Sequence, residues 1–133
     1  MIIVDSSVWI DFFNGIESQV TDKLDKLLGV AQLGIGDLIL TEVLQGFKTD
    51  KDYKVAKEHL LAFTVCDMLG KDAAILAAEN YRALRKKGIT IRKTNDVVIA
   101  SYCIRHGHSL LFSDKDFIPF VKHLGLKDAL TDT

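Results

Sequence analysis

The chain begins Met1-Ile2-Ile3-Val4-Asp5-Ser6-Ser7-Val8-Trp9-Ile10-Asp11, a stretch that predicts a strand, a turn and a helix. Its first apolar residues do not alternate with polar ones, which is typical of a central parallel strand covered on both faces. Asp5 would then lie at the carboxyl end of that strand, where open α/β sheets place their ligand sites. Ser6 or Ser7 can cap the following helix, because a hydroxyl accepts a hydrogen bond from an unpaired amide of the first turn.

Size and composition predict one folded domain covering residues 1–133. The chain is 48% hydrophobic and 26% charged, and its formal charge of -1 predicts no attraction of the whole molecule to polyanions. Any nucleic-acid binding must therefore be local. Cys66 and Cys103 are too few for a disulfide framework or a zinc site, which favours reduced thiols. The chain shows no basic secretory leader and no apolar run near the ~20 residues that span a bilayer, so we expect a cytoplasmic protein outside the membrane.

Apolar runs and helical periodicities alternate along the rest of the chain. Such alternation predicts an α/β sandwich with a mostly parallel central sheet. We expect Asp116 to cap a terminal helix whose first turn holds Pro119, and a polar tail after Gly125 to close the chain. The expected strands are 1–4, 33–36, 64–66 and 110–113, and the expected helices are 8–13, 20–28, 38–47, 49–63, 71–87, 96–106 and one from residue 119.

Four carboxylates stand where this fold would gather them. Asp5 and Asp114 each follow an apolar strand, and the carboxyl ends of parallel strands share one edge of the sheet. Asp96 opens a helix and Glu42 stands among apolar neighbours on another, so both can reach the same edge. Such acids would repel one another unless some were protonated or a cation neutralised them. Mg²⁺ or Mn²⁺ is the natural partner, because these ions prefer carboxylate oxygens, whereas zinc and copper favour His or Cys.

Each of these residues also has an ordinary structural interpretation. A single Asp after a strand is commonly a turn or cap residue, and an acid in the first turn of a helix is stabilised by the helix dipole. Only the combination of acids predicts a metal site. Basic residues at the end of the helix 71–87 can likewise stabilise its negative end or bind phosphate. They are Arg82, Arg85, Lys86 and Lys87.

Four blocks of the sequence, in order and with fitting gaps, resemble the motifs of PIN-domain ribonucleases, and most closely those of VapC toxins from toxin–antitoxin modules. The resemblance runs from residue 1 to about residue 120. No single block is specific, and the ordered set carries the resemblance. The blocks are Ile3-Val4-Asp5-Ser6-Ser7-Val8-Trp9-Ile10-Asp11, Thr41-Glu42-Val43-Leu44-Gln45-Gly46, Thr94-Asn95-Asp96-Val97-Val98-Ile99-Ala100 and Leu110-Leu111-Phe112-Ser113-Asp114-Lys115-Asp116-Phe117.

The resemblance implies a three-layer α/β/α sandwich of the PIN type that cleaves RNA endonucleolytically with Mg²⁺ or Mn²⁺. It also implies a homodimer silenced by a VapB-like antitoxin, whose carboxyl-terminal segment would cover the acidic pocket. Matched position by position, the family's catalytic and metal-binding acids are Asp5, Glu42, Asp96 and Asp114, with Asp116 as a supporting fifth acid and Ser6 as a supporting hydroxyl.

Two positions depart from the family pattern. Phe112 stands where members often have Thr or Ser, two positions before the fourth acid. Asn95 stands where many members have an apolar residue. Because of these departures, we expect the hydrogen bonding around Asp114 to differ from the family pattern more than the metal site does.

The expected mechanism is attack of a metal-activated water on the scissile phosphate, with RNA held by Arg92, Lys93 and the basic end of the helix 71–87. We expect the dimer surface on the first helices, because they carry aromatic and aliphatic residues. Two other functions stay open. A PIN-like domain could be a non-catalytic scaffold, although a scaffold has no reason to keep repelling carboxylates. A phosphatase with Asp5 as nucleophile would carry a second acid where Ser7 stands.

Overall fold

The computed structural model describes residues 1–131 of the protein. Its centre is a five-stranded sheet with the strand order β3-β2-β1-β4-β5. The neighbouring strands run parallel, as the alternation of strands and helices predicts. The strands are β1 (Ile2–Val4), β2 (Leu33–Gly36), β3 (Thr64–Cys66), β4 (Ser109–Leu111) and β5 (Lys127–Asp128).

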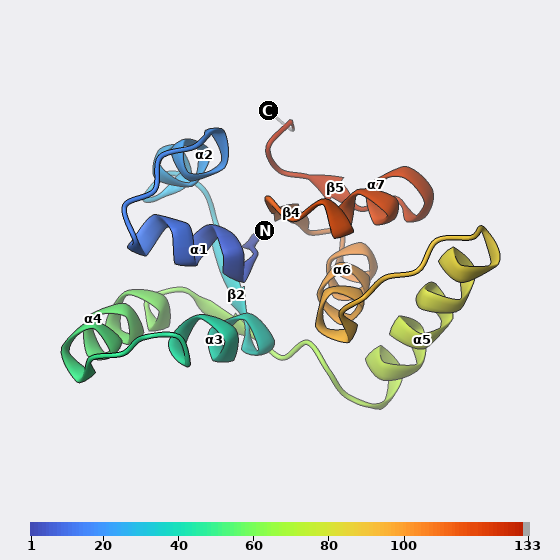
Figure 1. Cartoon of the computed structure of the whole chain (residues 1–133), viewed down its shortest axis with the longest axis horizontal. Coiled ribbons are helices and arrows are strands. Elements are labelled where there is room, and N and C mark those ends of the chain that lie inside the picture. Colours follow the sequence, from blue (N-terminus) through green and yellow to red (C-terminus); the bar gives the residue numbers. More distant parts are fainter. Residues whose placement is uncertain (132–133) are drawn as a thin grey trace.

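Helices connect the strands and flank the sheet (Figure 1). Among the described residues, none of them is both long enough and apolar enough to cross a bilayer. The helices are α1 (Ser6–Phe13), α2 (Gln19–Leu27), α3 (Asp37–Leu44), α4 (Asp50–Leu61), α5 (Lys71–Lys86), α6 (Thr94–His106) and α7 (Ile118–Leu124), and a 3-10 turn, η1 (Lys115–Phe117), precedes α7.

The helices form two layers around the strands. Figure 1 shows α1, α2, α3 and α4 on one side and α5, α6 and α7 on the other. A parallel sheet needs this double cover, because its strands are apolar on both faces. The arrangement confirms the three-layer α/β/α sandwich that the sequence predicts.

The register of β1 and β4 sets the position of two acids. Val4 pairs with Leu111, and the Asp5 amide donates to the Leu111 carbonyl at 2.9 Å. The two central strands therefore end together at one edge of the sheet. Asp5 follows the first strand directly and Asp114 follows the second after two residues, so both acids stand at this edge.

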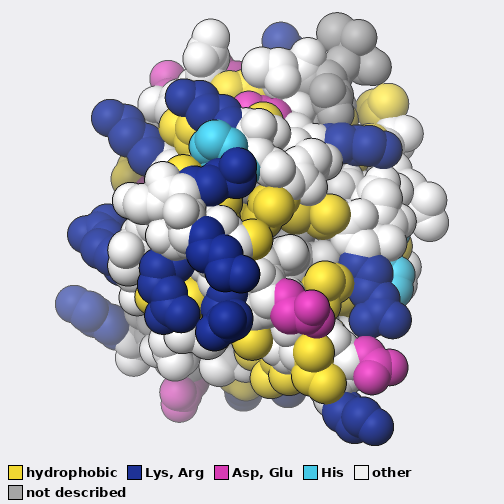
Figure 2. Space-filling view, turned by 90° about the vertical axis from the view of Figure 1, so that its right-hand side faces the viewer, with side chains coloured by type: hydrophobic (Ala, Val, Ile, Leu, Met, Phe, Trp, Pro, Cys, Tyr) yellow, Lys and Arg dark blue, Asp and Glu magenta, His cyan; other side chains and the backbone are white. Residues whose placement is uncertain are grey.

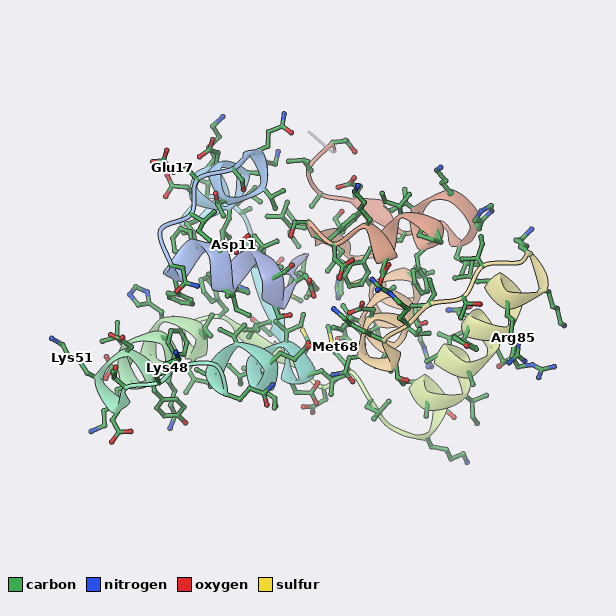
Figure 3. The ribbon with its side chains drawn as sticks, viewed as in Figure 1. Asp11, Glu17, Lys48, Lys51, Met68 and Arg85 are labelled. Atoms are coloured by element: carbon green, nitrogen blue, oxygen red, sulfur yellow. The ribbon has the colours of Figure 1, made fainter. Side chains whose placement is uncertain are left out.

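Glycines make room on β2 for two methionine side chains. A Cβ on Gly34 would overlap Met1 Sδ, and a Cβ on Gly36 would overlap Met68 Sδ. Met68 is fully buried, close to β2 and α3 (Figure 3). Gly36 also precedes the first residue of α3, so this close packing fixes where the helix that carries Glu42 begins.

An aromatic cluster fills the layer around α1. The Trp9 ring lies 5.5 to 6.1 Å from the rings of Phe12, Phe13 and Phe63, measured between centroids. Phe13 also contacts the Phe47 ring edge-on. The aromatic residues of the first helix therefore pack against rings from the segments just before and just after α4.

Three local expectations about helix caps and the tail were wrong. Asp5, not Ser6 or Ser7, is the N-cap residue of α1, and no side chain caps that helix. Asp114 caps η1 through its Oδ1, which accepts the Asp116 amide at 2.9 Å, so Asp116 does not cap the terminal helix. The tail forms β5, because β4 would otherwise leave its outer backbone groups unpaired.

Candidate metal centre

The structure brings the four predicted acids together from four segments. Asp5 precedes α1, Glu42 lies on α3, Asp96 lies in the first turn of α6, and Asp114 precedes η1. The charges of the other three acids each raise the pKa of Asp96, which places all four within electrostatic reach. Carboxylate oxygens of Asp96, Asp114 and Asp116 lie within 4.8 Å of one another. The supporting acid Asp116 thus adjoins the same cluster.

Burial and the charges of neighbouring acids raise the pKa of Asp5, Glu42 and Asp96. Asp5 and Asp96 are only 4% and 5% exposed, and Glu42 is half-buried. Burial is the largest cause that raises the pKa of each of the three. The charge of Asp5, followed by those of Asp114 and Glu42, helps to raise the pKa of Asp96 to about 7, although the Lys93 ammonium lowers it. Near neutral pH, Asp96 is therefore only partly ionised.

Two carboxylate oxygens of the cluster are buried without a partner. Within residues 1–131, Glu42 Oε1 and Asp96 Oδ2 accept no hydrogen bond. An unpaired buried polar atom costs about 1–3 kcal/mol, so folded proteins seldom leave one without a ligand. The available donors are carboxylate oxygens, which hard divalent cations prefer. The residues of this cluster therefore fit Mg²⁺ or Mn²⁺.

Serine hydroxyls orient the carboxylates. The hydroxyl of the predicted supporting residue Ser6 lowers the pKa of Glu42. Ser7 donates from Oγ to Asp5 Oδ2 at 2.9 Å and lies 3.1 Å from Ser113 Oγ. Sequence reasoning gave Ser7 only a capping role and missed Ser113. Their positions beside acids in the sequence are the one signal that could have found them.

The two departures from the family pattern have structural explanations. Phe112 is 8% exposed and packs on Phe117 with 5.3 Å between ring centroids, so it belongs to the core. A hydroxyl near the fourth acid comes instead from the next residue, Ser113. The Asn95 side chain lowers the pKa of Glu42, which an apolar residue at that position could not do.

Two cations stand at the solvent side of the cluster. Arg92 Nη2 lies 3.3 Å from Asp116 Oδ2, and Lys93 Nζ lies 3.5 Å from Asp114 Oδ2. Their side chains are 78% and 60% exposed, so each ion pair contributes at most ~1 kcal/mol to stability. Both residues predicted to hold RNA therefore stand beside the acids with most of their side chains in solvent.

The other predicted RNA-binding residues lie at the end of α5. Figure 2 shows Lys and Arg side chains gathered on the face of the molecule that carries this helix. Arg85 points away from the sheet (Figure 3), with its guanidinium 5.5 Å from the Tyr81 ring centroid. All four of these residues are exposed: Arg82, Arg85, Lys86 and Lys87. Arg82 and Arg85 also line an apolar groove.

This apolar groove, of about 610 Å³, runs between α5 and the start of α6. Leu69 and Ala78 are among its apolar walls, and Arg82 is among the cations that border it. Asn95 also lines the groove, and it precedes Asp96 in the sequence and lowers the pKa of Glu42, so the groove adjoins the acid cluster. Sequence reasoning missed the groove, because it exists only where α5 packs against α6.

Sequence comparison relates the chain to known proteins. The sequence pattern of the PIN domain family matches residues 2–120. Two similar curated proteins are the VapC ribonuclease Mb1587 of Mycobacterium bovis and the ribonuclease VapC11 of Mycobacterium tuberculosis. Each is 32% identical over 122 residues, which cover 88% of this chain and 89% of the relative.

Solved structures share the fold. The chain matches a structure of VapBC2 from Rickettsia felis bound to a DNA fragment from their promoter, with a TM-score of 0.74, 20% identity and 96% of both chains covered. It also matches a structure of VapBC-1 from nontypeable Haemophilus influenzae, with a TM-score of 0.72, 16% identity, and 97% of this chain and 98% of that chain covered. At these identities the likeness shows the fold alone.

Proposed function

The chain belongs to the PIN domain family, and on this basis we propose that it is a metal-dependent endoribonuclease, the toxin of a VapBC-type toxin–antitoxin module. The observation that carries the proposal is the pair of buried, unpartnered oxygens on Glu42 and Asp96 within the acid cluster. The curated VapC relatives are named as ribonucleases, which favours RNA as the substrate. An RNA substrate in turn favours action in the cytoplasm.

Mg²⁺ or Mn²⁺ is the proposed cofactor. Asp5, Asp96 and Asp114 would hold it, with Glu42 bound directly or through a water. Such an ion, when bound, neutralises charge on a scissile phosphate and lowers the pKa of a nearby water. Asp96 has to lose its proton before it can serve as a ligand, because its pKa is about 7 and carboxylates bind metals in the ionised form.

The residues around the acids prepare the site for RNA. Ser7 hydrogen-bonds to Asp5 and so orients that carboxylate before a substrate arrives, whereas Ser6 and Asn95 lower the pKa of Glu42 and favour its ionised form. Arg92 and Lys93 then offer exposed cations to the phosphates next to the scissile bond. The basic end of α5 would contact phosphates farther from the scissile bond. Because the net charge of the chain is -1, it can bind RNA only through such a local basic patch.

A VapB-like antitoxin is the proposed partner. The solved structures that share the fold are VapBC complexes. We place the carboxyl-terminal segment of the antitoxin over the acid cluster, where it would exclude RNA. The small open reading frame immediately upstream supplies the test: its product should copurify with this chain and inhibit RNA cleavage at equimolar concentration. Failure to bind or to inhibit would contradict the partner assignment.

We also propose a homodimer and place its interface on α5. The first helices were expected to form it; on α1 Ile10 is 37% exposed, and Ile16, in the loop between α1 and α2, is 49% exposed. Leu69, which lines the apolar groove just before α5, and Ile75, on α5 itself, are each 52% exposed. In a twofold dimer, the exposed apolar side chains of one subunit could pack into the apolar groove of the other, and the reverse contact would form at the same time.

Incubation of the purified protein with structured RNA separates a nuclease from a scaffold. We expect cleavage with Mg²⁺ or Mn²⁺ that leaves 5′-phosphates, and no cleavage in EDTA or by the Asp5→Asn variant. Equal inactivity of the wild type and the variant in every condition would favour a non-catalytic PIN-like scaffold. Hydrolysis of a generic phosphomonoester would favour a phosphatase instead.

A further inference from the structure

Lys93 places an ammonium group against the acid cluster. Its Nζ lies 3.5 Å from Asp114 Oδ2, and its charge lowers the pKa of both Glu42 and Asp96. The pKa of Lys93 is itself raised, first by Asp114 and then by Asp96. Lys93 is therefore a counter-ion for the cluster and not for Asp114 alone.

The two carboxylate oxygens of Asp114 have different partners. Oδ1 accepts the Asp116 amide at 2.9 Å, and this bond caps η1. Oδ2 accepts the Lys93 ammonium. A metal ion that took Asp114 Oδ2 as a ligand would compete with Lys93 for that oxygen, and its charge would repel the ammonium.

The ammonium of Lys93 can leave this position without a change of fold. The side chain is 60% exposed, and an ion pair in contact with solvent is weak. Lys93 precedes the first residue of α6 and lies outside regular secondary structure. Its flexible four-carbon stem lets the ammonium move while the backbone stays in place.

We propose that Lys93 is an exchangeable counter-ion: it occupies Asp114 Oδ2 while the cluster holds no metal, and metal binding releases its ammonium to contact an RNA phosphate. The inference rests on the proposed nuclease function and adds to it an order of events. Lys93 neutralises part of the charge of the cluster before the metal binds. After metal binding, the Lys93 ammonium is free to contact the substrate. Lys93 thus positions Asp114 in one state and contacts RNA in the other.

Titration with Mn²⁺ in the absence of RNA tests the exchange, with free Mn²⁺ measured by electron paramagnetic resonance. The matched control is Lys115→Met, because Lys115 is exposed, stands between Asp114 and Asp116 in the sequence, and forms no ion pair within residues 1–131. Lys93→Met should bind Mn²⁺ about 3- to 10-fold more tightly than the wild type, since a competing cation is gone. Lys115→Met should stay within about twofold of the wild type.

Cleavage of structured RNA at saturating Mn²⁺ tests the released state. Lys93→Met should cleave about 10-fold more slowly despite its tighter metal binding, because a phosphate contact is lost. Lys93→Arg should recover most of the rate, and Lys115→Met should match the wild type. A variant with a damaged structure would lose metal affinity and activity together, so opposite changes in the two quantities identify the exchange.

An Mn²⁺ affinity of Lys93→Met no higher than that of Lys115→Met would overturn the exchange. Unchanged cleavage by Lys93→Met would overturn the phosphate contact. If the wild type binds Mn²⁺ but cleaves no RNA, the nuclease proposal fails, and the affinity comparison still decides whether Lys93 competes with the metal. If the wild type binds no Mn²⁺, both proposals fall.

Discussion

The Ser7 hydroxyl donates to Asp5 Oδ2 across 2.9 Å and so fixes a carboxylate that is only 4% exposed. This hydrogen bond lowers the pKa of Asp5, whereas burial, the larger effect, raises it. Ser7 therefore keeps Asp5 closer to the ionised form that a metal ligand needs.

Replacement of Ser7 by Ala should weaken Mn²⁺ binding about 10-fold, because partners that orient metal ligands contribute 10- to 100-fold to affinity. Isothermal titration calorimetry on the free protein measures this loss. Ser113→Ala is the control, since Ser113 contacts Ser7 and not Asp5, and its effect should be smaller. Equal losses in the two variants would contradict a specific role for the bond to Asp5.

The metal-free protein should lose stability as the pH rises. The folded-state pKa of Asp96 is about 7 against an ordinary 3.8, and Asp5 and Glu42 shift in the same direction. The folded chain therefore holds more protons than the unfolded chain between about pH 4 and pH 7. The stabilisation from these acids is full below that window and is lost as the pH rises through it. In EDTA, calorimetry should give a Tm at pH 8 about 3–6 °C below that at pH 5.

Two controls assign this loss to the cluster. Asp96→Asn should remove much of the difference between pH 5 and pH 8, because the amide carries no charge at either pH. Saturating Mn²⁺ should reverse the trend, because the ionised acids bind the metal and binding stabilises the folded state. A Tm in EDTA that is higher at pH 8 than at pH 5 would show that the acids are not shifted as described.

Asp5→Asn should separate activity from stability. The change removes a buried negative charge next to other acids, so we expect the metal-free protein at pH 8 to gain about 1–2 kcal/mol in free energy of unfolding. RNA cleavage should fall at least about 100-fold, because a ligand is lost. Urea denaturation and a cleavage assay measure the two effects. Asp25→Asn, on an exposed part of α2, should change neither. Loss of both activity and stability would indicate a structural role for Asp5.

Ile75→Lys should convert the proposed dimer into a monomer, because it puts a charge on the apolar face of α5. Light scattering at several protein concentrations measures the molar mass. Val55→Lys is the matched control, since Val55 is 50% exposed on α4, against 52% for Ile75. A wild type that is monomeric at all concentrations would rule the dimer out, and dissociation by Val55→Lys would move the interface to α4.

The fold and the gathering of the acids could be predicted because both follow from short-range patterns. An apolar run that ends in an acid occurs twice, at Asp5 and Asp114. Parallel pairing of the two strands then places both acids at the same edge of the sheet. Asp96 could be placed because a helix begins close to it. The roles of these residues in catalysis stay predictions, since geometry shows proximity and not chemistry.

The finer contacts could not be predicted, because they depend on distances across the fold. Ser7 could cap α1 or turn toward Asp5, and only the position of Ser113 on the neighbouring segment shows that it does the latter. The packing partner of Phe13 could not be predicted from the sequence either, because Phe47 lies 34 positions away, beyond α3. The two-residue strand β5 pairs through its backbone, so its side chains carry no periodic pattern.

The pairing of Val4 with Leu111 also has a consequence for synthesis on the ribosome. Asp5 is synthesised long before its partner strand and Asp114, which lie more than 100 positions later in the sequence. A nascent chain that stops before β4 has no neighbour on that side of β1 and lacks the fourth acid. The proposed nuclease site would therefore stay incomplete until Asp114 has been synthesised.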